Sequence, residues 1–244
     1  MTEKEPIPDV WEGLPVVNAA AMRALDLAAT EKHGLQALDL MENAGRAVAA
    51  ECAAFLAAKG LSLAQSNVVV CCGRGANGGD GLVAARSLAE GGATVAAFLC
   101  PPKNDGAGEY PELVRVNLAR AKAAGVTITP AGPGSGLAAA LAWCHLAIDA
   151  LLGTGSNGKP AGAVHHMIRE LTLAKKPVIA VDIPSGLHPD TGDHGGVCVA
   201  AELTVTLGLP KRGLLAPHAK AQVGVLKVLD IGYPPGLIKG CASK

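Results

Sequence analysis

Aromatic residues are almost absent from this sequence, which has two Trp, two Tyr and two Phe among 244 residues. Hydrophobic residues nevertheless make up 50% of the chain, so its core must be built from Ala, Val, Leu and Ile. A chain of this length buries roughly 70% of the surface that its unfolded form exposes. We therefore expect a packed globular protein, with one α/β domain or at most two small ones.

An excess of one charge is also missing, because Lys plus Arg and Asp plus Glu both number 21. Proteins that bind nucleic acids or anionic membranes usually carry a basic excess. No run reaches the roughly 18 uninterrupted apolar residues that span a bilayer. We expect neither a nucleic-acid partner nor a membrane partner.

Disulfide and targeting signals are missing as well. The seven cysteines are odd in number, form no Cys-x-x-Cys pair and lie mostly in apolar runs. This pattern indicates buried thiols in a reducing compartment. The N-terminal stretch MTEKEPIPDVWEG is polar and has no apolar signal-peptide core. We expect a cytoplasmic protein.

Hydrophobic periodicity predicts an N-terminal helical extension, followed by strands that alternate with helices. Two helices are expected over residues 18–34 and 35–60, the first capped by Asn18. The later strand-like runs are continuously apolar, which is typical of a parallel sheet covered on both faces. The expected strands are 67–72, 94–100, 126–129, 145–152, 177–183, 202–209 and 224–231, and the expected later helices are 79–91, 108–124, 135–143 and 161–175.

The simplest interpretation is a single α/β domain over residues 1–244, arranged as a three-layer α/β/α sandwich with a mostly parallel central sheet. Residues 1–17 and 235–244 are expected to be tails. No clear helix separates the last two strands, so we expect these two to join the sheet antiparallel.

The glycine-rich stretch GRGANG, residues 73–78, matches the pattern G-x-G-x-x-G between a strand and a helix. Such glycines bring a ligand close to the N-terminal amides of the helix, which favour anions. Two features argue against an ordinary NAD site. The second strand ends in Cys100-Pro101-Pro102, where a ribose-binding acid should stand, and Asp80 would repel a phosphate. The turn also lacks the ending of a P-loop, and a tight turn with a capping acid remains the alternative.

Polar side chains also follow the fourth and fifth strands. Asp149 lies in an apolar strand that leads into LLGTGSNGK, residues 151–159, and Asp182 and Ser185 follow the next strand. Ligands of such sheets bind beyond the carboxyl ends of the strands, so these loops should converge with the glycine-rich turn. For Asp182, an Asx-turn before Pro184 is the alternative.

The side chains at this edge favour a hard cation. A serine hydrolase is excluded, because the nucleophile elbow needs G-x-S-x-G and Ile183 stands two residues before Ser185. Without a His or Cys cluster, the oxygen donors exclude zinc, and their few acids are compatible with a monovalent ion. These donors are Asn77, Ser185, Asp80, Asp149 and Asp182.

Together these motifs resemble the NAD(P)H-hydrate epimerase family, also called the YjeF N-terminal domain or apolipoprotein A-I-binding protein family. The resemblance covers nearly the whole chain and implies a Rossmann-like α/β/α sandwich that is often a homodimer. The matching stretches are LMENAGRAVA (40–49), CGRGANGGDGLVAAR (72–86), IDALLGTG (148–155), VIAVDIPSGLHPDTG (178–192), LTVTLGLPKRGLL (203–215) and LKVLDIGYP (226–234).

The resemblance also implies the site residues. One potassium ion per subunit would be coordinated by Asn77, Asp149 and Ser185, and Asp182 would be the catalytic acid or base. Ala76 replaces the family's usual asparagine, so one hydrogen bond to the substrate would be missing. The substrate-binding residues would be Ala76, Asn77, Gly78, Gly79, Asp80, Gly153, Thr154, Gly155, Ser156, Asn157, Gly158, Lys159 and Asp182.

The implied activity is that of an isomerase acting on NADHX or NADPHX, which carry a hydroxyl on ring carbon C6 beside the ring nitrogen. Loss of this hydroxyl gives an iminium-type cation, and water can return on either face to interconvert the R and S epimers. The amides of residues 78–80 and 153–155 would hold the diphosphate, with Lys159, or less directly Lys211, beside a phosphate. A separate NAD(P)H-hydrate dehydratase would be the functional partner.

Two other functions remain open. A non-catalytic ligand-binding or dimerising scaffold domain shares the fold, but scaffold versions tend to lose acids that this chain keeps at Asp80, Asp149 and Asp182. An NAD-dependent dehydrogenase is disfavoured by the missing acid after the second strand.

Overall fold

Seven strands form one parallel sheet in the computed structural model, which describes residues 6–102, 109–156 and 158–241. The strand order is β5-β4-β3-β6-β7-β8-β9, and each neighbouring pair is parallel. The predicted mostly parallel α/β fold is therefore confirmed. The strands are β3 (Asn67–Cys72), β4 (Thr94–Leu99), β5 (Thr127–Pro130), β6 (Leu146–Ala150), β7 (Val178–Val181), β8 (Leu203–Leu207) and β9 (Val225–Leu229).

The prediction that the last two strands join antiparallel was wrong, because β9 runs parallel to β8 and β8 runs parallel to β7. A parallel neighbour requires a crossover of a dozen or more residues. Residues 182–202 and 208–224 provide that length without a long helix. The second crossover holds only short turns of helix, namely η2 (Arg212–Leu215), η3 (Pro217–Ala219) and α7 (Lys220–Val223).

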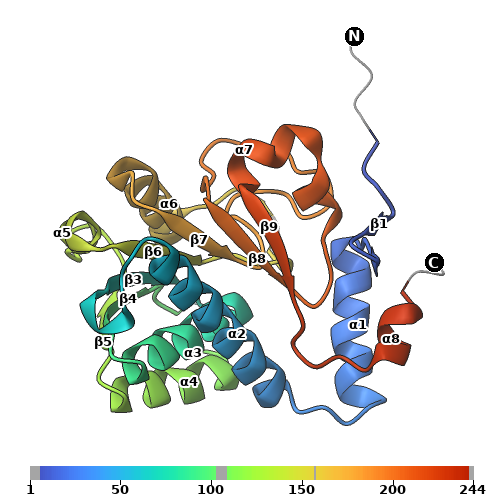
Figure 1. Cartoon of the computed structure of the whole chain (residues 1–244), viewed down its shortest axis with the longest axis horizontal. Coiled ribbons are helices and arrows are strands. Elements are labelled where there is room, and N and C mark those ends of the chain that lie inside the picture. Colours follow the sequence, from blue (N-terminus) through green and yellow to red (C-terminus); the bar gives the residue numbers. More distant parts are fainter. Residues whose placement is uncertain (1–5, 103–108, 157, 242–244) are drawn as a thin grey trace.

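Helices cover both faces of the sheet, as the continuous apolar strands predicted. Along β3, Val68 and Val70 face one core, whereas Val69 and Cys71 face the other. Figure 1 shows α2, α3 and α4 grouped on one side of the sheet and α5 and α6 on the other. These helices are α2 (Ala37–Ala58), α3 (Ala76–Glu90), α4 (Glu112–Ala123), α5 (Leu137–Trp143) and α6 (Gly162–Ala174).

The ends of the described chain are structured, although residues 1–17 and 235–244 were predicted as tails. The N-terminal segment holds a small hairpin, β1 (Val10–Trp11) and β2 (Leu14–Pro15), and the C-terminal segment holds α8 (Pro235–Lys239). Helix α8 packs beside α1 (Ala19–Glu31) at the edge of the molecule (Figure 1). The remaining short element is η1 (Leu63–Gln65).

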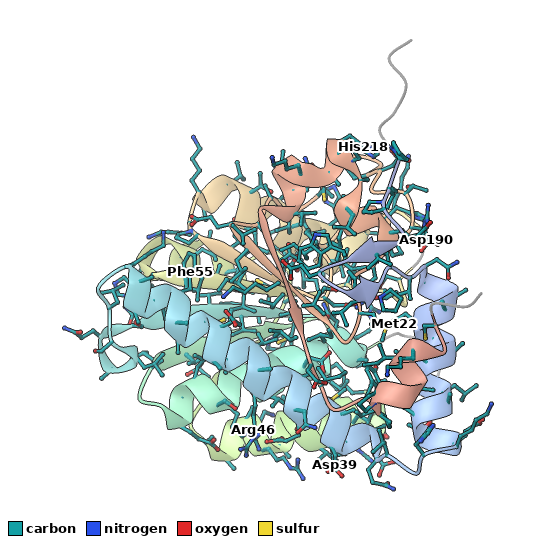
Figure 2. All side chains as sticks on the ribbon, turned by 45° about the vertical axis from the view of Figure 1, so that its right-hand side comes forward. Met22, Asp39, Arg46, Phe55, Asp190 and His218 are labelled. Atoms are coloured by element: carbon teal, nitrogen blue, oxygen red, sulfur yellow. The ribbon has the colours of Figure 1, made fainter. Side chains whose placement is uncertain are left out.

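The helical extension begins where the sequence predicts. Asn18 accepts a hydrogen bond from the backbone N–H of Ala21 at 2.7 Å, which caps α1. Figure 2 shows how side chains fill the space between helices and sheet, whereas Arg46 of α2 projects outward. None of the helices in the described ranges has the length and apolarity that a bilayer span requires.

The strand order places a topological switch point between β3 and β6. From β3 the chain moves through β4 to β5 at one edge, and then returns to β6 and continues to the opposite edge. Crevices at the carboxyl ends of such strands are the usual ligand sites of parallel sheets. The loops after β3 and β6 are the two that the sequence marks as glycine-rich.

Candidate functional site

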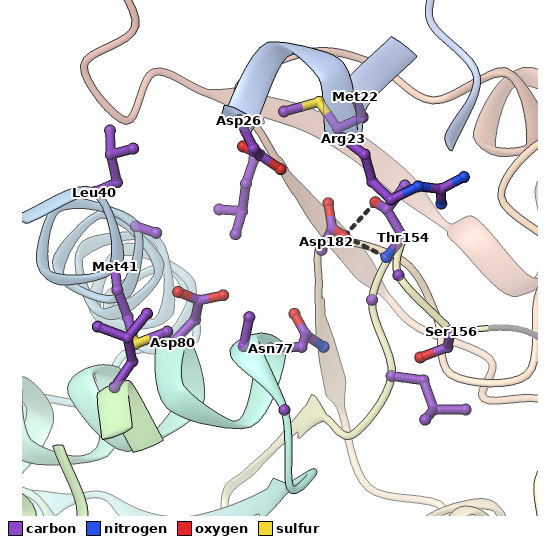
Figure 3. Close-up of a pocket in the computed structure, with 18 of the residues that line it drawn as sticks. Met22, Arg23, Asp26, Leu40, Met41, Asn77, Asp80, Thr154, Ser156 and Asp182 are labelled. Carbon is purple, nitrogen blue, oxygen red and sulfur yellow. Dashed lines mark hydrogen bonds between the residues drawn. The ribbon is translucent and has the colours of Figure 1, made fainter. Parts of the chain in front are cut away.

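A cavity of about 670 Å³ opens at this switch point. Its walls come from α1, α2, the start of α3, the loops after β6 and β7, and the segments after β8 and β9 (Figure 3). This volume is within the range of small-molecule sites. The cavity is lined by nine of the residues that the sequence singled out, namely Ala76, Asn77, Asp80, Gly153, Thr154, Gly155, Ser156, Asp182 and Lys211.

Glycines allow the loops after β3 and β6 to pack directly on one another. A Cβ atom at Gly73 would lie 1.9 Å from the carbonyl oxygen of Leu151, and one at Gly78 would lie 1.8 Å from that of Gly73. Neither contact is sterically possible. Packing within the fold therefore requires glycine at Gly73 and Gly78, whether or not a ligand binds at this turn.

The amides that the sequence analysis assigned to a diphosphate are partly used within the fold. Helix α3 begins at Ala76 instead of residue 79, so the Gly79 amide donates to the Gly75 carbonyl at 3.1 Å. The Thr154 amide donates to the carboxylate of Asp182 at 2.8 Å. The amides available to an anion at the start of α3 are consequently those of residues 76–78.

Asp182 stands at the end of β7, with φ = 67°. Its Oδ2 accepts hydrogen bonds from the backbone N–H and the hydroxyl of Thr154, at 2.8 and 2.6 Å. Its Oδ1 lies 2.6 Å from Nζ of Lys211. Burial alone would raise the pKa of Asp182, but the charge and hydrogen bond of Lys211 and the two donors of Thr154 lower it below its usual value.

Lys211 is held in one position, with an exposure of only 1%. Besides Asp182, its ammonium group donates to the Leu207 carbonyl at 2.7 Å and to the Thr206 hydroxyl at 3.0 Å. Val17 forms a bridge to the backbone of Lys211 from the N-terminal segment. From the sequence, Lys211 was a weaker candidate to pair with a phosphate. In the structure it forms an ion pair with the carboxylate of Asp182.

Asp80 lines the same cavity from α3 and is 8% exposed. Burial, followed by the nearby charges of Asp182 and Asp26, raises the pKa of Asp80 well above its usual value. Figure 3 shows Asp80 and Asp182 on different sides of the cavity, with Asn77 on the same helix as Asp80 and nearer to Asp182.

Asp26 and Tyr233 form a pair that the sequence analysis missed. The Tyr233 hydroxyl donates to Asp26 Oδ1, and both residues line the cavity. Burial raises the pKa of Asp26 more than the Tyr233 hydrogen bond lowers it. One residue comes from α1 and the other from the chain after β9, so no local spacing joins them.

Asp149 and Ser185 form a buried pair that does not line the main cavity. The carboxylate of Asp149 accepts hydrogen bonds from the Ser185 amide at 2.8 Å and hydroxyl at 2.6 Å. Burial raises the pKa of Asp149 to about 6. Asn77 donates to the Val181 carbonyl at 3.2 Å, whereas its buried Oδ1 has no hydrogen-bond partner among the described residues.

The loop after β6 separates the main cavity from a second one of about 310 Å³. Gly153, Thr154, Gly155 and Ser156 line the main cavity. Gly158 and Lys159 line the second cavity instead. Asn157 lies outside the described residues.

Comparisons with known proteins agree with this fold. Residues 37–213 match the family described as YjeF-related protein N-terminus. The crystal structure of yeast ynu0, YNL200c, is 23% identical, has a TM-score of 0.79, and covers 93% of each chain. At that identity the likeness shows the fold alone.

Curated relatives are more similar in sequence. A bifunctional NAD(P)H-hydrate repair enzyme Nnr of Thermofilum pendens is 39% identical over 95% of this chain, and the match covers 43% of that enzyme. The chain thus spans about two fifths of such bifunctional relatives. An NAD(P)H-hydrate epimerase of Elusimicrobium minutum is 37% identical over 92% of this chain and 99% of its own length. The chain therefore belongs to the YjeF-related protein N-terminus family.

Proposed function

We propose that this chain is an NAD(P)H-hydrate epimerase, an isomerase that interconverts the R and S epimers of NADHX and NADPHX. The observation that carries the proposal is the carboxylate of Asp182, which Lys211 and Thr154 hold in the cavity at the switch point. A relative named as an epimerase matches the chain over almost its full length, which supports the same reaction.

The reaction requires proton transfer to and from the oxygen atom that is bound to C6. The hydroxyl at C6 must leave with a proton, the ring nitrogen then stabilises the cation, and water must return with loss of a proton. A side chain inside a cavity that excludes bulk water can carry these protons. Asp182 is suited to this role as an acid or base, because its position is fixed by three neighbouring donor groups.

Substrate binding would use both glycine-rich loops. The free amides of residues 76–78 at the start of α3 would hold the diphosphate, and Ala76 and Asn77 line the cavity there. Gly79, whose amide donates to Gly75, would contact the substrate only through its missing side chain. On the other side, Gly153–Ser156 would contact the hydrated ring and its ribose. Lys159 is exposed and lines the second cavity, where it would pair with a phosphate that reaches past this loop.

Potassium fits three buried side chains, and we propose Asn77, Asp149 and Ser185 as its ligands. The buried Oδ1 of Asn77 has no hydrogen-bond partner among the described residues, and a cation would provide one. All three side chains offer oxygen, and only Asp149 carries a charge, which suits a monovalent ion. When bound, the ion would neutralise Asp149 and hold the start of α3, the end of β6 and the segment after β7 together.

The family also suggests a functional partner, a cellular compartment and an oligomeric state for this chain. The bifunctional relatives suggest that a NAD(P)H-hydrate dehydratase is the functional partner, and we place the enzyme in the cytoplasm as a homodimer. A dimerising or ligand-binding scaffold is the competing function. The cavity favours catalysis, because Asp80, Asp182 and Lys211 are all buried within it.

Epimerisation of NADHX tests this proposal. Purified protein and R-enriched NADHX would be incubated in potassium or sodium buffer, and the S epimer followed by chromatography. Asp182→Asn should lower kcat by about 10²–10⁴-fold, the usual contribution of acid–base catalysis. Glu90→Gln, which alters an exposed acid at the end of α3, is the control that should retain activity. Full activity of the Asp182→Asn protein would refute the acid–base role.

A further inference from the structure

Two carboxyl groups share the main cavity but have opposite surroundings. Asp182 lies within 2.8 Å of three donors, one of them the ammonium group of Lys211. Asp80 is also buried, yet no N–H or O–H group of the described residues hydrogen-bonds to its carboxyl group. A carboxylate without donors is poorly stabilised in such a place.

The other groups around Asp80 do not change this contrast. Across the cavity it faces Asp182, Asp26, Tyr233 and Lys211. Arg23 and Arg74 also line the cavity, but Lys211 is the cation that lowers the pKa of Asp80. Lys211 is already engaged by Asp182 at 2.6 Å. From α2, the apolar side chain of Met41 packs against Gly79, the residue directly before Asp80.

Burial and the two aspartates accordingly raise the pKa of Asp80, so this side chain keeps its proton under conditions in which Asp182 has lost its own. A pair of titratable groups that differ in this way provides an acid and a base within one site. Figure 3 shows the two carboxyl groups reaching into the cavity from different walls, from α3 and from the end of β7.

We propose that Asp80 is a second catalytic residue, the neutral acid that protonates the departing C6 hydroxyl on one face of the ring, while Asp182 is the base on the other face. This inference rests on the proposed epimerase function. It gives Asp80 a chemical role instead of a substrate contact alone.

The proton transfers balance over one turnover. Asp80 gives its proton to the hydroxyl as the C6–O bond breaks, the nitrogen lone pair forms the N=C6 bond, and one water molecule leaves. A water molecule then attacks C6 from the opposite face and gives a proton to Asp182, and the N=C6 π electrons return to nitrogen. The enzyme is left with Asp80 ionised and Asp182 protonated.

Lys211 drives the return to the starting state. Its positive charge at 2.6 Å favours the ionised form of Asp182, which therefore releases its proton to solvent, while Asp80 takes one up. The reverse conversion begins from the opposite protonation state, so the two directions use the two carboxyl groups in exchanged roles.

Oxygen exchange distinguishes this mechanism from a structural role of Asp80. Each NADHX epimer, labelled with ¹⁸O at C6, would be incubated in ordinary water with wild type, Asp80→Asn, Asp182→Asn and the Glu90→Gln control. Epimerisation and loss of label would be followed together by chromatography and mass spectrometry, after subtraction of the uncatalysed rates. Circular dichroism and urea unfolding would establish that each variant is folded.

We expect Asp80→Asn to lower kcat for epimerisation by about 10²–10⁴-fold. Asp182→Asn should lose epimerisation to a similar extent, yet still release label from the epimer whose hydroxyl faces Asp80. In that variant, the ionised Asp80 can return water to the same face. Such exchange without inversion is the signature of an independent acid at Asp80, and it decides the question even if Asp80→Asn does not fold.

Two results would overturn the inference while leaving the proposed function intact. One is an Asp80→Asn protein with kcat within about threefold of wild type, where acid catalysis predicts at least a hundredfold loss. The other is an Asp182→Asn protein that releases label from neither epimer. Absence of epimerisation by the wild type would instead refute the proposed function itself.

Discussion

Replacing Lys211 by Met should make the ionisation of Asp182 destabilise the fold, whereas in the wild type this ionisation is stabilising. The wild-type ammonium group is 1% exposed and lies 2.6 Å from the carboxylate. Removing one partner of a buried ion pair leaves an uncompensated charge, at a cost of about 3–5 kcal/mol. Met preserves most of the volume of the lysine stem, so cavity formation contributes little to this change.

The sign of the pH dependence follows from the surroundings of Asp182. In the wild type its folded pKa is lowered, so the carboxylate contributes stability above its unfolded pKa of about 3.9, and this contribution is lost as pH falls through the folded pKa. Without Lys211, burial raises the folded pKa instead. The variant then loses stability as pH rises from about 4 towards the raised pKa, by about 1.4 kcal/mol per pH unit. Lys211 also lowers the pKa of Asp26 and Asp80, so its loss shifts these groups in the same direction.

Urea unfolding at pH 5, 6, 7 and 8 measures this effect directly. The difference in unfolding free energy between wild type and Lys211→Met should grow with pH, and adding Asp182→Asn to the variant should remove much of the growth. Lys227→Met is the control, since that lysine pairs with Glu51 on the surface and should cost at most about 1 kcal/mol. A Lys211→Met protein with a constant difference across this range would refute the reasoning.

Three further predictions concern other parts of the site. Ala76→Asn should lower KM several-fold with kcat nearly unchanged, because Ala76 lines the cavity without a hydrogen-bonding side chain; an unaltered KM in steady-state kinetics would show that no such contact forms. Potassium chloride should raise the melting temperature of the wild type above its value in lithium chloride of equal ionic strength, and Asn77→Ala should abolish the difference; equal shifts in both proteins would exclude Asn77 as a ligand. Tyr233→Phe should lower the unfolding free energy by about 1–3 kcal/mol, since it removes the donor to Asp26; urea unfolding that coincides with wild type would contradict this.

Local pattern was sufficient for the elements that build the site. The apolar run of β3 and the glycines that follow it predict a strand, a tight turn and a helix, and the structure has them at Asn67–Cys72 and Ala76–Glu90. Both signals can be read within a few residues, as a continuous apolar run and a cluster of glycines. The contact of Gly73 with Leu151, in contrast, is long-range. Asp149 and Asp182 were likewise found from their place at the ends of apolar strands.

Long-range partners could not be found in this way. Asp26 and Tyr233 are 207 positions apart, and nothing in the spacing of either residue indicates the other. The ion pair of Lys211 with Asp182 depends on the path of the chain after β8, which the sequence analysis expected to turn back antiparallel. The Thr154 amide was assigned to a phosphate because a pattern cannot show that Asp182 takes its hydrogen bond.

The most direct test of the central claim is the rate at which the purified protein converts R-enriched NADHX to the S epimer in potassium buffer. Our account predicts conversion well above the spontaneous rate, and a loss of about 10²–10⁴-fold in the Asp182→Asn protein. A folded wild-type protein that leaves the spontaneous rate unchanged, in potassium and in sodium, would contradict the account and indicate a binding domain.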